Sequence, residues 1–328
     1  MIASQGVPRV GIVVIGRNEG ERLARALRSV DPGTNTVVYV DSGSSDGSLM
    51  LAEQLGAQVA SLDLSRPFSA GRARNLGFSV ALQGGRELEF VQFIDGDCEL
   101  DHRWIAEASA FLTAHPDVAV VCGRRRERFP DRSPYNKLCD MEWNTPVGEA
   151  LASGGDFLVR TKAFQDVGGF ADHMIAGEEP EMCARLRAAG WKIWRIDAEM
   201  TLHDANILRW TQWWRRCVRS GYAHAAIARL HGNGPDKLKK RETLSVIVWG
   251  GLLPAFILAA SIFNPIFLGA FLLYPAQILR LTLKAPERDG ALLFATSVVL
   301  GKFAEFVGVC KFAAARLAGR HDTLIEYK

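Results

Sequence analysis

Two carboxylates separated by one glycine directly follow a short apolar stretch, and this spacing is the clearest candidate for chemistry in the sequence. Asp95-Gly96-Asp97 comes after residues 90–94, which have the length and composition of a buried parallel strand. Two anionic side chains there repel each other unless a cation or hydrogen-bond donors lie between them. Such oxygen ligands suit Mg²⁺ or Mn²⁺, which keep coordination positions open for a diphosphate. We therefore hypothesise a metal ion that carries a nucleotide diphosphate, although the triplet is also ordinary turn chemistry.

Strand-like and helical stretches alternate before this motif. The predicted strands lie at residues 10–15, 36–40 and 58–62, and the predicted helices at residues 22–30 and 48–55. This repetition predicts an α/β fold with a mostly parallel sheet flanked by crossover helices. Ligands of such sheets bind at the carboxyl ends of the strands, so Asp41 and Asp95 are expected to face one crevice. The polar loop that begins at Asp41 is also typical of a helix N-cap.

Three further motifs have charged residues or glycines whose positions suggest a local role. Arg74 lies in the first turn of a helical pattern, where it opposes the helix dipole and favours an anionic partner. Gly154 and Gly155 lead into an apolar strand and allow the close approach of a ligand or of another backbone. Glu178 and Glu179 open a helix, where negative charge is favourable on electrostatic grounds alone.

The order of these motifs resembles that of the family 2 glycosyltransferases with the GT-A fold, over roughly residues 9–220. The motifs concerned are Asn18-Glu19, residues 40–47, residues 73–77, Asp95-Gly96-Asp97 and residues 177–186. The resemblance implies a nucleotide-sugar site in which Asp41 and Arg74 line the base pocket together with Asn18 and Glu19. It also implies that Asp95 approaches the ribose or the metal and that Asp97 binds the metal directly.

The same resemblance implies roles for the second half of the catalytic region. Gly154, Gly155 and Asp156 would frame the sugar and the acceptor, although Asp156 is otherwise read as a solvated turn residue. Glu179 would be the general base, with Glu178 as a rival, because a glutamate stands where an aspartate is commoner. His203 would lie near the metal, or else it is a structural histidine. Departures from the family pattern at Gly16, Arg17 and Ser42 leave the sugar nucleotide open.

Three segments are given weaker interpretations. Residues 124–146 are long and polar and are predicted to form an irregular flap that faces the acceptor. Residues 191–196 are predicted to be an edge-type strand. The helical pattern at residues 210–219 combines tryptophans and arginines but lacks the Q-x-x-R-W spacing of processive relatives, which favours a non-processive enzyme. Its arginines would contact a diphosphate or form an interfacial face.

Composition limits the class of protein. The 328 residues are 48% apolar and 23% charged, as in a soluble enzyme with one large or two modest cores. The formal net charge of +3 is too small to indicate nucleic acid as a partner. The six cysteines show neither paired nor histidine-linked spacing, which favours a reduced, cytosolic compartment. The short polar stretch at residues 1–9 predicts no signal peptide.

The C-terminal third changes character. Two apolar runs at residues 244–262 and 266–283 are each long enough to cross a bilayer. Positive charge at their outer ends predicts a hairpin whose two ends lie in the cytosol. Lys302 and Glu305 interrupt a third apolar segment at residues 290–318, which either spans the membrane or lies on it as an amphipathic helix. The predicted regions are a catalytic domain at 1–231, a basic linker at 232–243 and membrane-associated helices at 244–328.

These observations lead to one hypothesis with alternatives. It is an inverting, metal-dependent glycosyltransferase of the hexosyltransferase type at the cytoplasmic face of the inner membrane. It would transfer sugar from a nucleoside diphosphate sugar, UDP-linked, to a lipid-linked or saccharide acceptor in cell-surface polysaccharide or glycolipid assembly. The alternatives are transfer to a polyprenyl phosphate, or a non-catalytic membrane scaffold that binds nucleotide sugars. A nucleotidyltransferase is disfavoured because no Gly-rich triphosphate loop follows the first strand, and the oligomeric state stays open.

Overall fold

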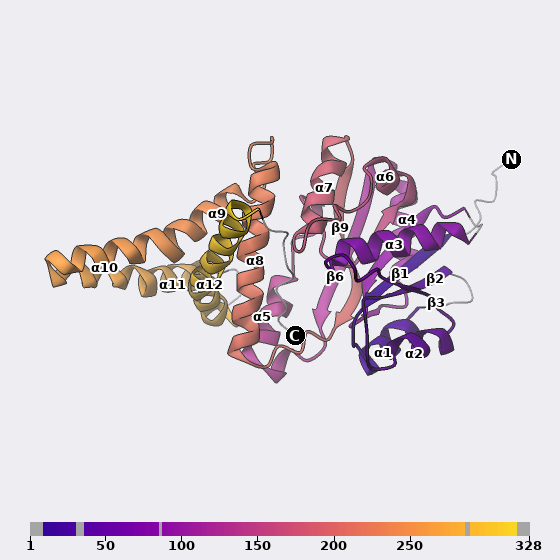
Figure 1. Cartoon of the computed structure of the whole chain (residues 1–328), viewed down its shortest axis with the longest axis horizontal. Coiled ribbons are helices and arrows are strands. Elements are labelled where there is room, and N and C mark those ends of the chain that lie inside the picture. Colours follow the sequence, from indigo (N-terminus) through magenta and orange to yellow (C-terminus); the bar gives the residue numbers. More distant parts are fainter. Residues whose placement is uncertain (1–8, 31–35, 85–86, 286–288, 320–328) are drawn as a thin grey trace. The chain divides into compact units, whose positions relative to one another are not determined.

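The computed structural model describes residues 9–30, 36–84, 87–285 and 289–319, which form two compact units (Figure 1). The first unit comprises the described residues within Met1–Arg128 and Trp143–Ala205. The second comprises those within Phe129–Glu142 and Asn206–Lys328. The first unit therefore holds every residue for which a catalytic, nucleotide or metal role is predicted, apart from the arginines of residues 210–219.

One mixed sheet organises the first unit. Across the sheet, its strands are β3 (Gln58–Ser61), β2 (Thr36–Asp41), β1 (Val10–Gly16), β4 (Phe90–Asp95), β8 (Phe157–Arg160), β6 (Val118–Glu127), β9 (Lys192–His203) and β5 (Cys98–Leu100), and β7 (Gly148–Ala150) also pairs with β9. Neighbours from β3 to β4 run parallel, as do β6 and β9. The antiparallel strands β5, β7 and β8 are only three or four residues long. The predicted α/β fold with a mostly parallel sheet is confirmed.

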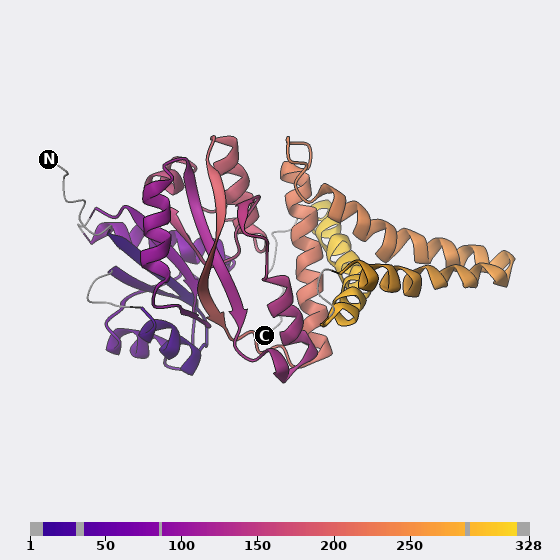
Figure 2. The same ribbon diagram turned by 180° about the vertical axis from the view of Figure 1, so that it is seen from behind.

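Crossover helices cover both faces of the parallel part. Helices α1 (Glu21–Arg28) and α2 (Ser48–Gln54) lie on one face and α3 (Ala70–Gln83) on the other (Figures 1 and 2). Helix α3 approaches the sheet closely through Gly77, where a Cβ atom would lie 2.3 Å from a methyl carbon of Val13. The register aligns Gly16 with Asp41 and Ile15 with Asp95. The two aspartates thus end adjacent parts of one sheet edge, as predicted.

An aromatic cluster forms the core beneath the middle of the sheet. The Phe93 ring lies 5.3 Å from the rings of Phe157 and Phe164 and 5.5 Å from that of Phe170. All four side chains are almost fully buried. Each aromatic pair contributes about 0.5–1.5 kcal/mol beyond the area that it buries. The cluster also includes helix α6 (Thr161–Asp166), and it fixes the segment that leads to α7 (Glu178–Ala188).

Two predictions in this region were wrong. Residues 124–127 continue strand β6 instead of beginning a flap, and most of the rest of that segment forms η1 (Pro130–Arg132) and α5 (Pro134–Glu142). Strand β9 is not an edge strand, because it continues for twelve residues and pairs with β6 on one side and with β7 and β5 on the other. Each long strand supplies the hydrogen-bond partners of the other, so polar residues 124–127 stay in the sheet.

The second unit is helical. Its elements are α5, η1, α8 (Trp210–His231), α9 (Lys240–Ile247), the π-helical turn η2 (Val248–Leu252), α10 (Leu253–Phe263), η3 (Pro265–Leu272), α11 (Leu273–Lys284) and α12 (Ala291–Leu317). Among the described residues, three helical segments are long and apolar enough to cross a membrane: Lys240–Phe263, Pro265–Lys284 and Ala291–Leu317. Apolar C-terminal helices were predicted at these places. The boundary predicted at residue 231 falls at the end of α8, which belongs to this unit.

Candidate active site

The loops that follow β1 and β2 are tied together through Asn18. Its backbone N–H donates to Oγ of Ser44 at 2.9 Å, and its Oδ1 accepts from the N–H of Ser45 at 2.7 Å. The backbone of Asn18 has φ 56°, a left-handed conformation that asparagine tolerates better than most residues. Glu19 does not point to the same partners, because it pairs with Arg22 at 2.7 Å across the start of α1.

Asp41 is buried and shapes the loop of which it is the first residue. Its Oδ2 accepts from the N–H groups of Gly43 and Ser44 at 2.8 and 2.9 Å, and its Oδ1 accepts from the Tyr39 hydroxyl at 3.0 Å. Burial, together with the charge of Asp41, raises the pKa of Tyr39, so that hydroxyl stays a donor. Asp41 thus organises a turn at the carboxyl end of β2.

Arg74 connects the carboxylates of two distant motifs. Its guanidinium donates to Oδ1 of Asp95 at 2.8 Å and to Oε1 of Glu179 at 3.0 Å, and it lies 3.4 Å from Oε1 of Glu178. The side chain is only 3% exposed and lies over the Phe170 ring. Burial lowers the pKa of Arg74, but the three carboxylates outweigh burial and hold that pKa above its ordinary value. A fixed positive charge thus joins β4 to the N-terminus of α7.

Glu178 and Glu179 differ in their access to solvent. The Glu179 side chain is 16% exposed, whereas that of Glu178 is 3% exposed. Burial and the neighbouring Glu178 raise the pKa of Glu179 to about 7, although Arg74 opposes the shift. Glu178 directs Oε1 toward Arg74, and its Oε2 has no hydrogen-bond partner among the described residues. Glu179 is therefore the more exposed of the two carboxylates, and its raised pKa lies close to neutral pH.

A second arginine, Arg125, was missed in the sequence. It donates through Nε to Oδ2 of Asp156 at 2.8 Å and through Nη2 to Oδ2 of Asp95 at 3.1 Å, and it lies over the Trp143 ring. It stands between two other arginines at the end of β6, in the segment that was read as a flap. Alternation along a strand would have turned the middle arginine toward the opposite face from its neighbours, and that is the signal that could have found it.

Asp156 is neither a solvated turn residue nor exposed to an acceptor. Its side chain is completely buried. Its Oδ1 accepts a hydrogen bond from the backbone N–H of Asp95, and its Oδ2 accepts from Arg125 and from Thr201. The burial of a charge is tolerated here because a guanidinium and two further donors compensate for it. Asp156 therefore positions Asp95 and Arg125 rather than presenting a free carboxylate.

The glycine pair before Asp156 has two different environments. A Cβ atom on Gly155 would lie 2.6 Å from Nη2 of Arg74 and 2.9 Å from Oδ2 of Asp95, which is too close for any side chain. A Cβ atom on Gly154 would meet nothing within 4 Å. Gly155 is therefore required by the Arg74–Asp95 contact, whereas Gly154 borders open space.

Asp97 lies in a separate cluster with His203. Oδ1 of Asp97 is 3.2 Å from Nε2 of His203, and the Cys98 thiol lies 3.7 Å from the same oxygen. Burial and the charge of Arg125 lower the pKa of His203 to about 4, so the imidazole is neutral at pH 7. Burial raises the pKa of Cys98 well above its ordinary value, and the thiol stays protonated.

The side chains of Asp97 and His203 fit a divalent metal ion. The predicted metal ligands fall into two groups. The ligand atoms of Asp97, Cys98 and His203 lie within 4.8 Å of one another, and those of Asp95, Cys98 and Asp156 form a second such group. Both oxygens of Asp95 already accept from arginines. A carboxylate with a neutral imidazole suits Mn²⁺ better than Mg²⁺, which prefers oxygen ligands alone. The structure thus brings His203 to Asp97, while Asp95 is held by Arg74 and Arg125.

Known proteins resemble this chain in sequence and in fold. The model of "Glycosyl transferase family 2" matches residues 11–168. Glycosyltransferase AglE of Haloferax volcanii is 24% identical over 263 residues, 76% of this chain and 82% of that protein. The O-antigen chain rhamnosyltransferase RfbN of Salmonella typhimurium is 22% identical over 216 residues, 60% of this chain and 67% of that protein.

A solved structure has a similar fold. Mannosyltransferase PcManGT from Pyrobaculum calidifontis, in complex with GDP-Man and Mn²⁺, superimposes with a TM-score of 0.67 at 17% identity, over 93% of this chain and 87% of that chain. This likeness concerns the fold. The family match includes β2, β4, helix α3 and the loop after β1, which carry Asp41, Asp95, Arg74 and Asn18. Residues 11–168, slightly less than half of the chain, are similar to glycosyl transferase family 2, and the protein is a glycosyltransferase whose catalytic unit has the GT-A fold.

Proposed function

We propose that the enzyme is inverting and metal-dependent, and that it transfers a sugar from a UDP-linked donor to a hydroxyl of a lipid-linked or saccharide acceptor. Cell-surface polysaccharide or glycolipid assembly is the process in which we place it. The relative RfbN is named for O-antigen chain synthesis, which supports this class of product. The structural neighbour was solved with GDP-Man, so a GDP-linked donor is the rival to be tested beside UDP.

The donor is proposed to lie along the edge formed by the ends of β1, β2 and β4. Asn18 and Asp41 fix the two loops on one side of this edge, and Arg74 fixes Asp95 on the other. We assign Asp97 and His203 as the protein ligands of Mn²⁺ or Mg²⁺. When bound, such an ion would stabilise the negative charge of the leaving diphosphate. Arg125 keeps Asp95 and Asp156 in place next to this group.

Glu179 is proposed as the general base. Its pKa of about 7 lets the carboxylate accept a proton from the acceptor hydroxyl while that oxygen attacks the anomeric carbon. Arg74 orients Glu179 and ties it to the β4 end, where the donor is proposed to bind. A single in-line displacement on the face opposite the leaving diphosphate inverts the anomeric centre. Glu178 is proposed to hold Arg74 from its buried side.

The chain of contacts from Asp95 through Arg74 to Glu179 is the observation that carries this proposal. The test compares Glu179→Gln with Glu178→Gln, using release of nucleoside diphosphate with a hydroxyl acceptor. Loss of a general base lowers turnover by about 10²- to 10⁴-fold. We expect that loss for Glu179→Gln, while donor binding persists. A larger loss for Glu178→Gln would transfer the role of base to Glu178.

Transfer to a polyprenyl phosphate is the second candidate function. Such an acceptor is already ionised and needs no base, so Glu179→Gln would leave turnover nearly unchanged with a polyprenyl phosphate. The raised pKa of Glu179 favours a hydroxyl acceptor instead. A non-catalytic scaffold would bind a nucleotide sugar without turning it over with any membrane lipid extract.

Three apolar helical segments indicate association with a membrane. We propose that Lys240–Phe263 and Pro265–Lys284 form a hairpin in the inner membrane and that the catalytic unit faces the cytosol. Basic residues at 237–241 and Lys284 flank the hairpin, as expected for ends that remain in the cytosol. A lipid-linked acceptor would then be within the same membrane surface.

Helix α12 is proposed to lie at the membrane surface rather than to span the bilayer. It packs backbone to backbone on α8, where a Cβ atom on Gly308 would lie 2.0 Å from the carbonyl oxygen of Val218. Helix α8 carries four arginines, at positions 215, 216, 219 and 229. A spanning α12 would draw those arginines toward the hydrocarbon, which costs about 2.5–3.5 kcal/mol for each one at the centre of the bilayer. Its Lys302–Glu305 ion pair also lies near the middle of α12.

A further inference from the structure

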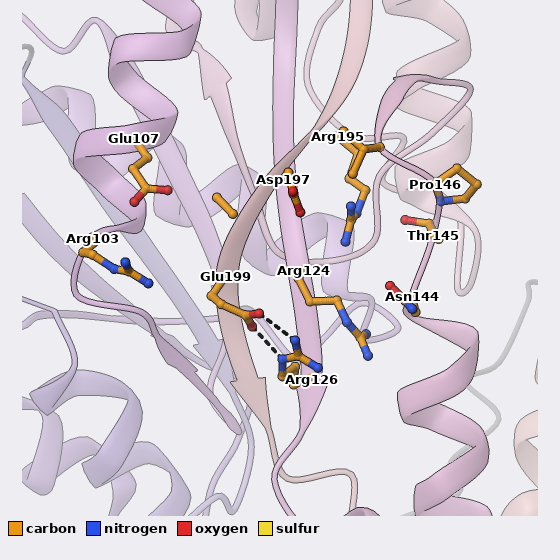
Figure 3. A pocket seen from close by; sticks show the side chains of 12 residues that line it. Arg103, Glu107, Arg124, Arg126, Asn144, Thr145, Pro146, Arg195, Asp197 and Glu199 are labelled. Atoms are coloured by element: carbon orange, nitrogen blue, oxygen red, sulfur yellow. Dashed lines mark hydrogen bonds and ion pairs between the residues drawn. The ribbon is translucent and has the colours of Figure 1, made fainter. Parts of the chain in front are cut away.

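A second cleft lies in the first unit, lined by side chains that the proposed reaction does not use. It has a volume of about 580 Å³ (Figure 3). The lining side chains come from β6, β9, the start of α4 (Trp104–Ala114) and the segment before β7. The charged ones are Arg103, Glu107, Arg124, Arg126, Arg195, Asp197 and Glu199. Four arginines face three carboxylates, so the formal charge of the lining is +1.

Arg195 is the unusual member of this lining. It is 4% exposed, and its Nε is buried without a hydrogen-bond partner among the described residues. Its side chain points along the cleft toward Arg124, as Figure 3 shows. A guanidinium stays charged in proteins, and burying it without full compensation is unfavourable. An anion in the cleft would supply the acceptor that Nε lacks.

The carboxylates of the cleft do not fill this role. Glu199 is held by Arg126 in a two-pronged contact, with Nε and Nη2 donating at 2.8 and 2.7 Å. Glu107 and Asp197 are exposed side chains of the lining. A phosphate group has oxygens in several directions and can accept from more than one guanidinium at once. The arrangement therefore favours a phosphate-bearing ligand over a cation.

The cleft and the active site share structural elements. Arg124 and Arg126 line the cleft, while Arg125 between them donates to Asp95 and Asp156 in the active site. Trp143 packs on Arg125 and on the His203 ring, and the residues that follow it, 144–147, form a wall of the cleft. A ligand bound here would hold both segments that carry active-site contacts.

We propose that this cleft is a second, phosphate-binding site, separate from the site of sugar transfer, with Arg195 at its floor and Arg103 at its rim. The ligand is a phosphate monoester or diester, which is either a soluble phosphate compound or a phospholipid headgroup. This site stands on the cleft geometry alone and does not require the proposed donor or acceptor.

The test measures how phosphate changes the reactivity of a thiol placed in the cleft. Val147 is 54% exposed and lines the cleft, so Val147→Cys is labelled with a maleimide in the full-length protein in detergent, in a Cys310→Ser background that removes an exposed thiol. Sodium phosphate is titrated with a chelator present at constant ionic strength. We expect phosphate to slow this labelling at least fivefold at saturation (about 1 kcal/mol of protection). Met50→Cys on α2 is the control, and phosphate should not change its labelling.

Two substitutions test whether Arg195 binds the phosphate that protects Val147→Cys from labelling. Arg195→Met should raise the phosphate concentration for half-protection by about tenfold or more, because a hydrogen bond to a charged group is lost. Arg103→Gln at the exposed rim leaves the fold intact. It should raise the phosphate concentration for half-protection by a smaller factor. The labelling of Val147→Cys is also measured in phosphatidylcholine bilayers. If it is slowed only when phosphatidic acid is added, the ligand is a phospholipid headgroup. Unchanged labelling with both phosphate sources, or equal protection in both variants and the parent protein, would overturn the proposal.

Discussion

Gly155 lies against Arg74, so a single methyl group added at this position should lower activity while the protein stays folded. In Gly155→Ala the new Cβ would lie 2.6 Å from Nη2 of Arg74 and 2.9 Å from Oδ2 of Asp95. Non-bonded atoms normally approach to about 3.5 Å, so the guanidinium must retreat by about 1 Å. Arg74 is 3% exposed and held by three carboxylates, so it cannot retreat without lengthening one of these contacts. Its 2.8 Å bond to Asp95 would then exceed hydrogen-bonding distance.

The expected loss follows from that broken contact. A hydrogen bond between charged groups contributes about 1.5–3 kcal/mol, which corresponds to a fall of about 10- to 100-fold in turnover if the contact orients the reacting groups. Gly154→Ala is the matched control, because its Cβ would meet nothing within 4 Å. The assay is release of nucleoside diphosphate from both variants, with thermal unfolding measured in parallel. Equal activity of the two folded variants would refute the role given to the Arg74–Asp95 contact.

Three further predictions concern protonation, metal binding and topology. Because the carboxylate must be ionised to accept a proton, kcat/KM should rise with pH through about 7, and this limb should vanish in Glu179→Gln; a limb that persists would exclude Glu179. His203→Gln should raise the Mn²⁺ concentration for half-maximal turnover by about tenfold or more, whereas His102→Gln at an exposed position should leave it unchanged. A C-terminal tag should be cleaved by protease from the same membrane side as the catalytic unit, and cleavage from the opposite side only would show that α12 spans.

The parallel half of the sheet could be predicted because its signals are local. Apolar strands, polar turns and helical periodicity follow one another from β1 to β4, and the rule that ligands bind at carboxyl ends placed Asp41 and Asp95 correctly. The apolar C-terminal segments were equally visible, because length and lack of charge suffice to identify them. The position of Arg74 in the first turn of a helical pattern also predicted an anionic partner, which the structure confirms.

The remaining features depend on contacts between distant segments. The end of β6 is rich in arginine and looks like a loop until β9 pairs with it and Asp156 compensates Arg125. Asp156 follows two glycines and looks exposed, but Thr201 and the N–H of Asp95 bury it. The separation of Asp95 from Asp97 likewise arises from arginines that lie far away in sequence. No local pattern specifies such partners.

The most direct test of the account is nucleoside diphosphate release from a panel of sugar nucleotides, including UDP- and GDP-linked donors. Detergent-solubilised wild type and Asp97→Ala would be compared with Mn²⁺ and a membrane lipid extract as the source of acceptor. The account predicts release from one donor that requires both the extract and the metal and that disappears in Asp97→Ala. Undiminished release in Asp97→Ala, or in the presence of chelator, would contradict the metal-dependent transfer that we propose.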